Sequence, residues 1–427
     1  MHILCLFDYN CTAGKTGFSR VSETIIPALK KHFGHKLKLD IAAINMFPQF
    51  TEDGKLKTET NAFWEDENTF VFSGSHYSHR PHPGMEDVSD PFGRFEFLDR
   101  LQQHPKGFDG VFIMQDIGVV LDIVPLMQQI KQTLKATKRK QFKSIYYFPV
   151  DNDSYRDLTN LSFFDEIITY TQWGRESLHL QKPDLKGKVK VIPHGLDNKT
   201  FYIEPQRKDY SKFIIGNVNR NNRRKNMPDT LLAFKHLQSI WNIAEQQPVL
   251  YLHCDPTDPL GFNLLNLCKQ LGLVIGEDVL FGNPCTDNEL RAIYNSLDCY
   301  VTTATGGGWE LTVAEAMACG VPCILPAHTS FLELGANNRC IYLNELSLFC
   351  NDSEESKYRP RVNIEEVAEK IMDYALIADG QQPVYNESLM IDNNIQKMID
   401  NGQSFVKNNL QWADINKLWI NLFKQTF

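Results

Sequence analysis

The sequence lacks the features that mark exported, membrane-spanning or strongly basic proteins. None of its ten cysteines forms a C-x-x-C pair, and most lie inside apolar runs, which is typical of reduced core residues in a cytosolic protein. The first residues, MHILCLFDYN, contain no basic leader, and no apolar stretch is long enough to span a membrane. The formal net charge is -8, so no overall field draws the chain to nucleic acid or to an anionic membrane. These absences predict a soluble cytoplasmic protein.

The 427 residues contain apolar, strand-like runs that alternate with amphipathic segments such as 20–31 and 227–240. This alternation is typical of βαβ units and mainly parallel sheets. A polar, turn-rich stretch at 194–212 divides the runs into two sets. We therefore predict an α/β protein of two doubly wound, Rossmann-like domains that face a cleft, with ligands at the carboxyl ends of the strands. The predicted strands are 3–7, 111–114, 145–150, 166–170 and 189–192 in the first half, and 213–218, 249–253, 279–281, 299–303, 323–325 and 340–343 in the second.

Residues 50–100 interrupt this pattern with a polar segment rich in aromatic residues and histidine. Long loops in compact domains are commonly functional or disordered, and the aromatic residues favour a partly ordered cover near an acceptor. His76, His79 and His82 lie three apart in this segment. Prolines between and after them break any helix that would align the three rings, so a solvated loop is favoured over a metal site.

The tail, 405–427, carries apolar residues at helical spacing and is predicted as a helix that packs back toward the first domain. The predicted organisation is then an acceptor-side domain over 1–195 that contains the insertion, a nucleotide-sugar-binding domain over 196–404, and this C-terminal helix.

Three consecutive glycines, 306–308, stand between a predicted strand and a helix expected to begin at Thr312 and end at Gly320. Adjacent glycines let the backbone approach a ligand closely, and a helix start offers unpaired N–H groups to an anion. This order predicts a clamp for a nucleotide or a sugar phosphate. Thr312 and Glu315 also fit a T-x-x-E capping box, in which Glu315 would only hold the helix start.

A basic run follows the predicted strand 213–218, with Arg220 at the strand end and Lys225 five residues later. Arginine suits bidentate contacts to oxygen and lysine suits a point contact, so the two could neutralise a diphosphate from opposite sides. A solvated basic turn is the alternative. The carboxyl end of a strand is, however, where α/β proteins bind ligands.

The loop after the first strand contains Gly14, Lys15 and Thr16, which resemble the end of a phosphate-binding P-loop. That motif requires a glycine where Tyr9 stands, and no second acidic strand supports a magnesium site. A glycine-bearing strand-to-helix loop is favoured, with the Gly17 N–H beside a phosphate or sugar, while a plain tight turn stays open. A phosphotransferase that uses Lys15 and Thr16 is the less favoured alternative.

Together these segments resemble the second domain of GT-B glycosyltransferases, specifically the large group 1 (GT4-like) retaining family. The resemblance is strong over about residues 190–345, weaker over the first domain and absent from the insertion. The matching residues are the pair Arg220 and Lys225, the segment Pro193-His194-Gly195-Leu196-Asp197 with Phe201, and the block from Leu297-Asp298 through Glu315-Ala316-Met317-Ala318-Cys319-Gly320-Val321-Pro322.

The resemblance implies an enzyme that moves a hexose from a UDP- or GDP-linked sugar to an acceptor hydroxyl with retention of configuration. It also implies that no metal or other cofactor is bound. Glu315 would hold the nucleotide ribose, and the loop at Gly308, Leu311 and Thr312 would face the diphosphate and sugar. The acceptor stays open among a glycan, a protein, a metabolite and a modified base, as does the oligomeric state.

Two positions depart from the family pattern. The first glutamate of its paired-glutamate motif falls on Gly307, and a glycine of that motif falls on Glu310. Either Glu310 supplies the missing acid through a shifted loop, or a different group does that work. Where the first domain of the family often carries a histidine, this chain has Asp151, which could accept a hydrogen bond from the sugar or acceptor, or be a turn residue. A non-catalytic sugar or nucleotide binder of the same fold is the alternative.

Overall fold

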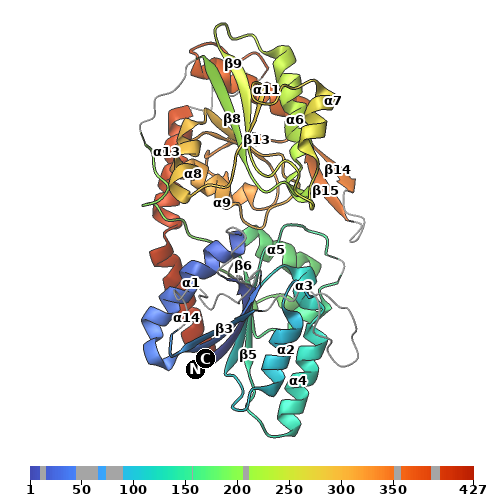
Figure 1. Ribbon diagram of the computed structural model, residues 1–427, viewed down its shortest axis with the longest axis vertical. Helices are drawn as coiled ribbons and strands as arrows, with labels where there is room; N and C mark the ends of the chain where they lie inside the picture. The colour runs from blue at the N-terminus through green and yellow to red at the C-terminus, as the bar shows by residue number, and fades with distance from the viewer. Residues whose placement is uncertain are drawn as a thin grey trace, which may run out of the picture. The chain divides into compact units, whose positions relative to one another are not determined.

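The protein divides into two compact units, each an α/β domain (Figure 1). Apart from the short segment 151–155, which already belongs to unit 2, the chain passes from unit 1 to unit 2 between His194 and Gly195, and returns between Gln411 and Trp412. Unit 1 comprises residues 1–150, 156–194 and 412–427, and unit 2 comprises 151–155 and 195–411. The computed structural model describes residues 1–9, 16–44, 66–73, 90–155, 157–204, 211–350, 357–385 and 395–427.

Unit 1 is built on a seven-stranded parallel sheet in the order β3-β2-β1-β4-β5-β6-β7. Every residue of the central strand β4 is buried. Parallel strands covered on both faces read as continuous apolar runs, which is why the sequence indicated most of them. The strands are β1 (His2–Asp8), β2 (Lys38–Ile44), β3 (Thr69–Ser73), β4 (Gly110–Met114), β5 (Lys143–Phe148), β6 (Glu166–Thr169) and β7 (Val189–Val191).

The C-terminal helix α14 (Trp412–Thr426) completes unit 1 and packs beside α1 (Gly17–Phe33) (Figure 1). Its Trp419 is fully buried, with the ring centroid 5.3 Å from that of Phe112. The predicted apolar face is confirmed except at Leu418, which is 44% exposed. The other helical segments of the unit are η1 (Gly34–Lys36), α2 (Arg94–Gln103), α3 (Ile117–Leu121), α4 (Val124–Ala136), η2 (Thr159–Phe163), α5 (Gln172–Gln181) and η3 (Pro183–Leu185).

The boundary at 405 was wrong. Phe405 and Val406 lie on α13 (Ile395–Asn409) and pack into the core of unit 2, so the return to unit 1 begins only at Trp412. The apolar spacing runs through both helices, which hides the change of unit from a sequence pattern.

Unit 2 is built on a six-stranded parallel sheet in the order β10-β9-β8-β11-β12-β13, with a separate antiparallel hairpin, β14-β15. The strands are β8 (Lys212–Val218), β9 (Gln247–His253), β10 (Val279–Phe281), β11 (Cys299–Val301), β12 (Cys323–Pro326), β13 (Ile341–Leu343), β14 (Leu346–Cys350) and β15 (Tyr358–Val362). The helical segments besides α13 are η4 (Arg223–Lys225), α6 (Met227–Ile240), α7 (Leu264–Leu271), α8 (Asp287–Ser296), α9 (Leu311–Ala318), α10 (Phe331–Leu334) and α11 (Ile364–Ala378).

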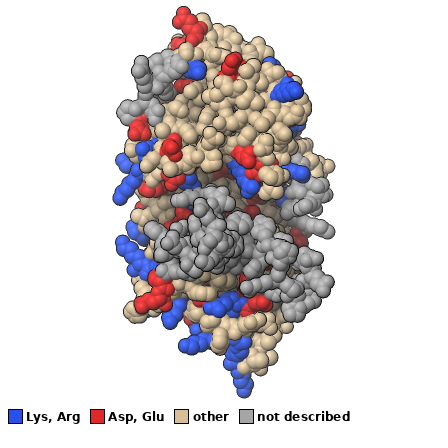
Figure 2. Space-filling view, in the orientation of Figure 1, with Lys and Arg blue, Asp and Glu red and all other residues tan. Residues whose placement is uncertain are grey.

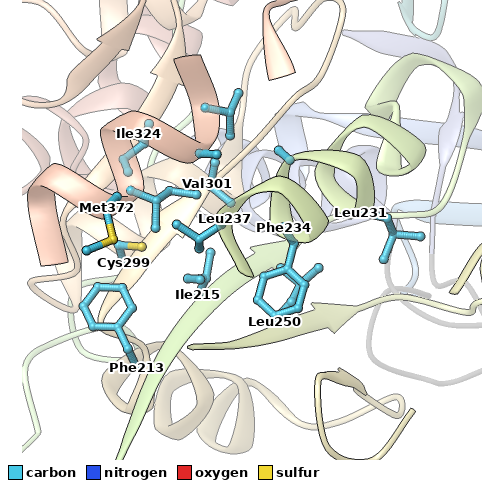
Figure 3. Close-up of a cluster of buried hydrophobic side chains, with 14 of the residues drawn as sticks. Phe213, Ile215, Leu231, Phe234, Leu237, Leu250, Cys299, Val301, Ile324 and Met372 are labelled. Atoms are coloured by element: carbon cyan, nitrogen blue, oxygen red, sulfur yellow. The ribbon is translucent and has the colours of Figure 1, made fainter. Parts of the chain in front are cut away.

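Alternate residues of the unit 2 strands feed two separate apolar layers, one on each face of the sheet. Ile215 packs in the layer under α6 and α11 (Figure 3), whereas its neighbour Ile214 packs against the layer formed with α8, α9 and α13. Cys299 and Tyr300 divide in the same way. This two-residue period places both faces under helices, as a doubly wound domain requires.

The predicted strands are all present, but residues 50–100 are not simply an inserted loop. Residues 69–73 form β3 of the sheet, and α2 begins at Arg94. Strand β2 was not predicted. The segments 45–65 and 74–89, with the three histidines discussed above, lie outside the described residues.

Charges of both signs are interspersed over the face in view in Figure 2, in keeping with the modest net charge. Cys5, Cys254, Cys299, Cys323 and Cys340 are buried as predicted. None of the described helices combines the length and the apolar composition that a membrane span needs.

Candidate active site

The strand order of unit 2 reverses between β8 and β11. These neighbouring strands continue to opposite edges of the sheet, through β9 and β12 respectively. Ligands of open α/β sheets bind at this reversal point. The loops that leave it are 219–226 after β8 and 302–310 after β11, and they contain the basic run and the glycine triplet.

Hydrogen bonds tie these two loops together. The backbone carbonyl of Arg224 accepts from the N–H of Thr305 at 2.8 Å and from its hydroxyl at 3.1 Å. The Thr303 hydroxyl donates to the carbonyl of Asn226 at 2.9 Å and lies 2.7 Å from the hydroxyl of Thr230. The basic run and the glycine loop are therefore one structural unit.

A third loop, after β12, fixes the glycine triplet. The Gly307 N–H donates to the hydroxyl of Thr329 at 3.1 Å, and the Ser330 N–H donates to the Gly307 carbonyl at 3.2 Å. Gly306 is held closely as well, because a Cβ there would lie 2.4 Å from the carbonyl oxygen of Asp151. Close approach of backbone to backbone explains the glycine at this position.

Lys225 and Glu310 form a buried ion pair between the two loops. The Lys225 ammonium contacts Oε2 of Glu310, and both side chains are less than a tenth exposed. Burial lowers the pKa of Lys225 to about 8, although the carboxylate of Glu310 acts in the opposite direction. Arg224 also approaches this carboxylate, with 3.4 Å between Nη1 and Oε1.

Asp151 lies beside the same basic cluster. Its carboxylate is 3.3 Å from Nε of Arg224 and 3.5 Å from Nη2 of Arg359, which comes from β15. Burial alone would raise the pKa of Asp151, but the charges of Arg359 and Arg224 lower it overall. Asp151 is thus an ionised partner of two guanidiniums; its hydrogen bond to a sugar or acceptor stays a prediction.

Arg220 points to a different partner from Lys225. Its guanidinium pairs with the carboxylate of Asp258, with 2.6 Å from Nε to Oδ2 and 3.4 Å from Nη2 to Oδ1. The side chain is 60% exposed, so a change of rotamer costs little packing. The joint grip of Arg220 and Lys225 on a diphosphate stays a prediction.

The predicted capping box at Thr312 and Glu315 was wrong. Helix α9 begins at Leu311 with Glu310 as its N-cap residue. The Thr312 hydroxyl lies 2.9 Å from the hydroxyl of Tyr300 instead, and Glu315 is buried and accepts a hydrogen bond from Tyr294 at 2.8 Å. A tertiary contact has replaced the local one, and the ribose role of Glu315 stays a prediction.

The glycine loop and the start of helix α9 lie close to their predicted positions. Gly308 is buried in the loop, and Leu311 opens α9. The first N–H groups of a helix have no backbone partner within it, so the Leu311 and Thr312 amides are positioned to receive an anion. That contact is a prediction.

Unit 1 contributes fewer candidates. Thr16 caps α1, and its hydroxyl donates a hydrogen bond to the carboxylate of Asp8 at 2.7 Å. In a P-loop this hydroxyl would bind magnesium, whereas here it has a structural role. Gly17 is the first residue of α1 and has open space where a Cβ would be, so packing does not require glycine there. Lys15 lies outside the described residues.

One set of possible metal ligands lies close together within the described ranges: His2, Asp40 and His104, with ligand atoms within 4.8 Å of one another. Asp40 also pairs with Arg100, with 2.6 Å between Oδ2 and Nη2. The guanidinium already balances this buried carboxylate, so an ion-pair network accounts for the group. The absence of a bound metal or cofactor stays a prediction.

Sequence reasoning did not select Arg224 or Arg359. Arg224 stands in the basic run beside Lys225, so its position in that run was an available signal. Arg359 lies 208 residues from Asp151 in the sequence, and no motif marks it.

Comparison with known proteins agrees with this architecture. Residues 198–354 match the family model described as Glycosyl transferases group 1, and no curated protein matches the sequence. Sucrose-phosphate synthase from Thermosynechococcus elongatus is similar at a TM-score of 0.64 and 16% identity, over 100% of this chain and 98% of that one. Anabaena HepE, solved with UDP and glucose, has a TM-score of 0.62 and 15% identity over 100% of both chains. Trehalose-6-phosphate synthase has a TM-score of 0.62 and 13% identity over 99% of both.

Fold and matches together define a GT-B protein of two Rossmann-like domains. The resemblance to the group 1 glycosyltransferases is confirmed over residues 198–354, which fall within unit 2.

Proposed function

We propose that this protein is a retaining glycosyltransferase that moves a hexose from a nucleoside-diphosphate sugar to an acceptor hydroxyl. The observation that carries the proposal is the cluster of the buried Lys225 and Glu310 with the partly exposed Arg224, at the carboxyl ends of β8 and β11 and next to the start of α9. The family match covers these residues. HepE was solved with UDP and glucose, which supports a nucleotide sugar as the donor here.

In the proposed reaction, the bond between the anomeric carbon and the diphosphate oxygen breaks. The acceptor oxygen bonds to the same face of that carbon, and its proton passes to the departing diphosphate. Negative charge grows on the leaving group, and fixed cations and N–H groups aimed at that charge are usually the largest catalytic contribution. Lys225, Arg224 and the amides at the start of α9 supply them, so the proposal needs no metal.

The remaining residues have the following proposed roles. Glu315 holds the ribose, and Arg220 turns from Asp258 to the outer side of the diphosphate. Glu310 supplies to the sugar the acid that the family pattern would place at Gly307.

Within the proposal, unit 1 presents the acceptor, with Gly17 beside a donor phosphate or sugar. Asp151, which belongs to unit 2, accepts hydrogen bonds from the sugar and positions Arg224 through the ion pair between them. UDP and GDP are the candidate nucleotides.

Calorimetric titration of UDP and GDP into the wild type and Lys225→Met tests the donor site. Loss of a charged hydrogen bond costs about 2 kcal/mol, so the variant should bind the preferred nucleotide roughly 30-fold more weakly. Lys235→Met is the matched control, because Lys235 is exposed on α6 and contacts Gln238; its affinity should equal that of the wild type. Equal affinity in Lys225→Met, in protein shown to be folded by its melting curve, would refute the donor site.

A further inference from the structure

Gly307 and Glu310 share one space in unit 2. A Cβ added at Gly307 would lie 2.5 Å from Oε1 of Glu310 and 3.0 Å from its Cγ. Real Cβ atoms essentially never approach a neighbour within 3.0 Å. The carboxylate of Glu310 therefore lies where a side chain at position 307 would begin.

The carboxylate of Glu310 lies beside the cations that the proposed function assigns to the donor diphosphate. It contacts the Lys225 ammonium and approaches the Arg224 guanidinium, and Glu310 is the N-cap residue of α9. Glu310 is only 3% exposed. Lys225 and Arg224, which the proposed function assigns to the leaving diphosphate, thus already have an internal partner.

Charge balance indicates what would replace that partner. Three cationic side chains, Arg224, Lys225 and Arg359, form ion pairs with two carboxylates, Asp151 and Glu310, and the charge of Lys357 also acts on Asp151. Cations are therefore already in excess, and withdrawal of Glu310 would increase that excess by one charge. A nucleotide sugar carries one negative charge on each of its two phosphates and would more than replace the charge of Glu310.

We propose that Glu310 is an internal counter-ion that competes with the diphosphate of the donor for Lys225 and Arg224. The inference rests on the proposed function and adds the order of events: the diphosphate takes over both cations, and the released carboxylate becomes free to contact the sugar. Ligands without a diphosphate then bind poorly, because a sugar alone offers nothing to replace Glu310. This exchange makes Glu310 a determinant of substrate class.

Removal of the Glu310 charge should change binding and turnover in opposite directions. The probe is inorganic pyrophosphate, which carries the charge without a base or a sugar. Glu310→Gln keeps the shape of the side chain and removes the competing charge, so pyrophosphate should bind about tenfold more tightly than to the wild type. Turnover of the donor should fall, because the glutamine amide cannot supply to the sugar the carboxylate that Glu310 is proposed to supply. A purely structural role would not raise anion affinity.

Two variants serve as controls. Glu277→Gln removes the same charge from an exposed position in the loop before β10 and should leave pyrophosphate affinity unchanged, which excludes an effect of net charge. Glu310→Asp draws the carboxylate back by one methylene group and should give an intermediate gain in affinity. If Glu310→Gln does not fold, the pyrophosphate affinity of Glu310→Asp tests the proposal in its place.

The outcomes separate this inference from the function on which it rests. Unchanged or weaker pyrophosphate binding by the Glu310 variants, with intact donor binding by the wild type, overturns the counter-ion role alone. If neither the wild type nor the variants bind pyrophosphate, UDP or GDP, the proposed function fails as well.

Discussion

At the scale of single residues, the arrangement of Gly307 and Glu310 explains a departure from the family pattern. The resemblance predicts glutamate at 307 and glycine at 310, and this chain has the reverse. Because the Glu310 carboxylate lies where a side chain at 307 would begin, a glutamate at 307 would clash with Glu310 as it now lies. The two departures therefore belong together, since glycine at 307 leaves room for the carboxylate of Glu310.

This account predicts a pair of compensating substitutions. Gly307→Glu adds a side chain against Glu310 and buries a second negative charge, and overpacking alone costs about 1–3 kcal/mol. We expect the free energy of unfolding, measured in urea, to fall by about 2 kcal/mol or more. The double variant Gly307→Glu/Glu310→Gly restores the family order and should recover most of that loss. Equal stability of the single and double variants would show that the two positions do not share one space.

At the scale of secondary structure, the elements that the sequence revealed are the buried parallel strands. Strand β2 escaped because its apolar run contains the charged Asp40, which is buried only through its pairing with His2 and Arg100. Strand β3 escaped because it lies at the sheet edge inside a polar segment, and its Phe70 is half exposed. Both strands depend on partners elsewhere in the sequence, and a local sequence pattern does not show these partners.

The residues of the candidate site also fall into two groups: those that a local sequence pattern marks and those that only long-range contacts bring together. Spacing along the chain was sufficient to select Lys225, Glu310 and Glu315, because strand ends and glycine loops mark their positions. The pairing of Arg220 with Asp258 and the link from Arg359 to Asp151 join residues 38 and 208 positions apart. The capping box failed because a tertiary contact took its place: Tyr300, on strand β11, engages the Thr312 hydroxyl of helix α9.

Helix α9 offers a test of whether Glu315 binds the nucleotide or only supports the helix. Tyr294→Phe removes the hydrogen bond to Glu315 and should lower the free energy of unfolding by about 1.5–3 kcal/mol, the range for bonds to charged groups. Nucleotide affinity should change little in this variant, provided the carboxylate keeps its place. Glu315→Ala should weaken nucleotide binding at least tenfold as well as lower the melting temperature. If calorimetry shows that Glu315→Ala binds the nucleotide as well as Tyr294→Phe does, the role of Glu315 is structural.

At the scale of the whole molecule, the two units have different proposed tasks. Apart from Gly17, the residues proposed to contact the donor lie in unit 2, as does the match to the group 1 glycosyltransferases. Unit 1 has the same parallel, doubly wound plan, and its proposed task is to present the acceptor.

The most direct measurement of the central claim is release of nucleoside diphosphate from a panel of UDP- and GDP-linked hexoses. The wild type should turn over at least one donor. Arg220→Ala and Lys225→Ala should each lose about 2–4 kcal/mol of transition-state stabilisation, which is roughly 30- to 1000-fold in kcat/KM. Turnover that is unchanged in both variants, or binding without turnover by the wild type, would contradict the account.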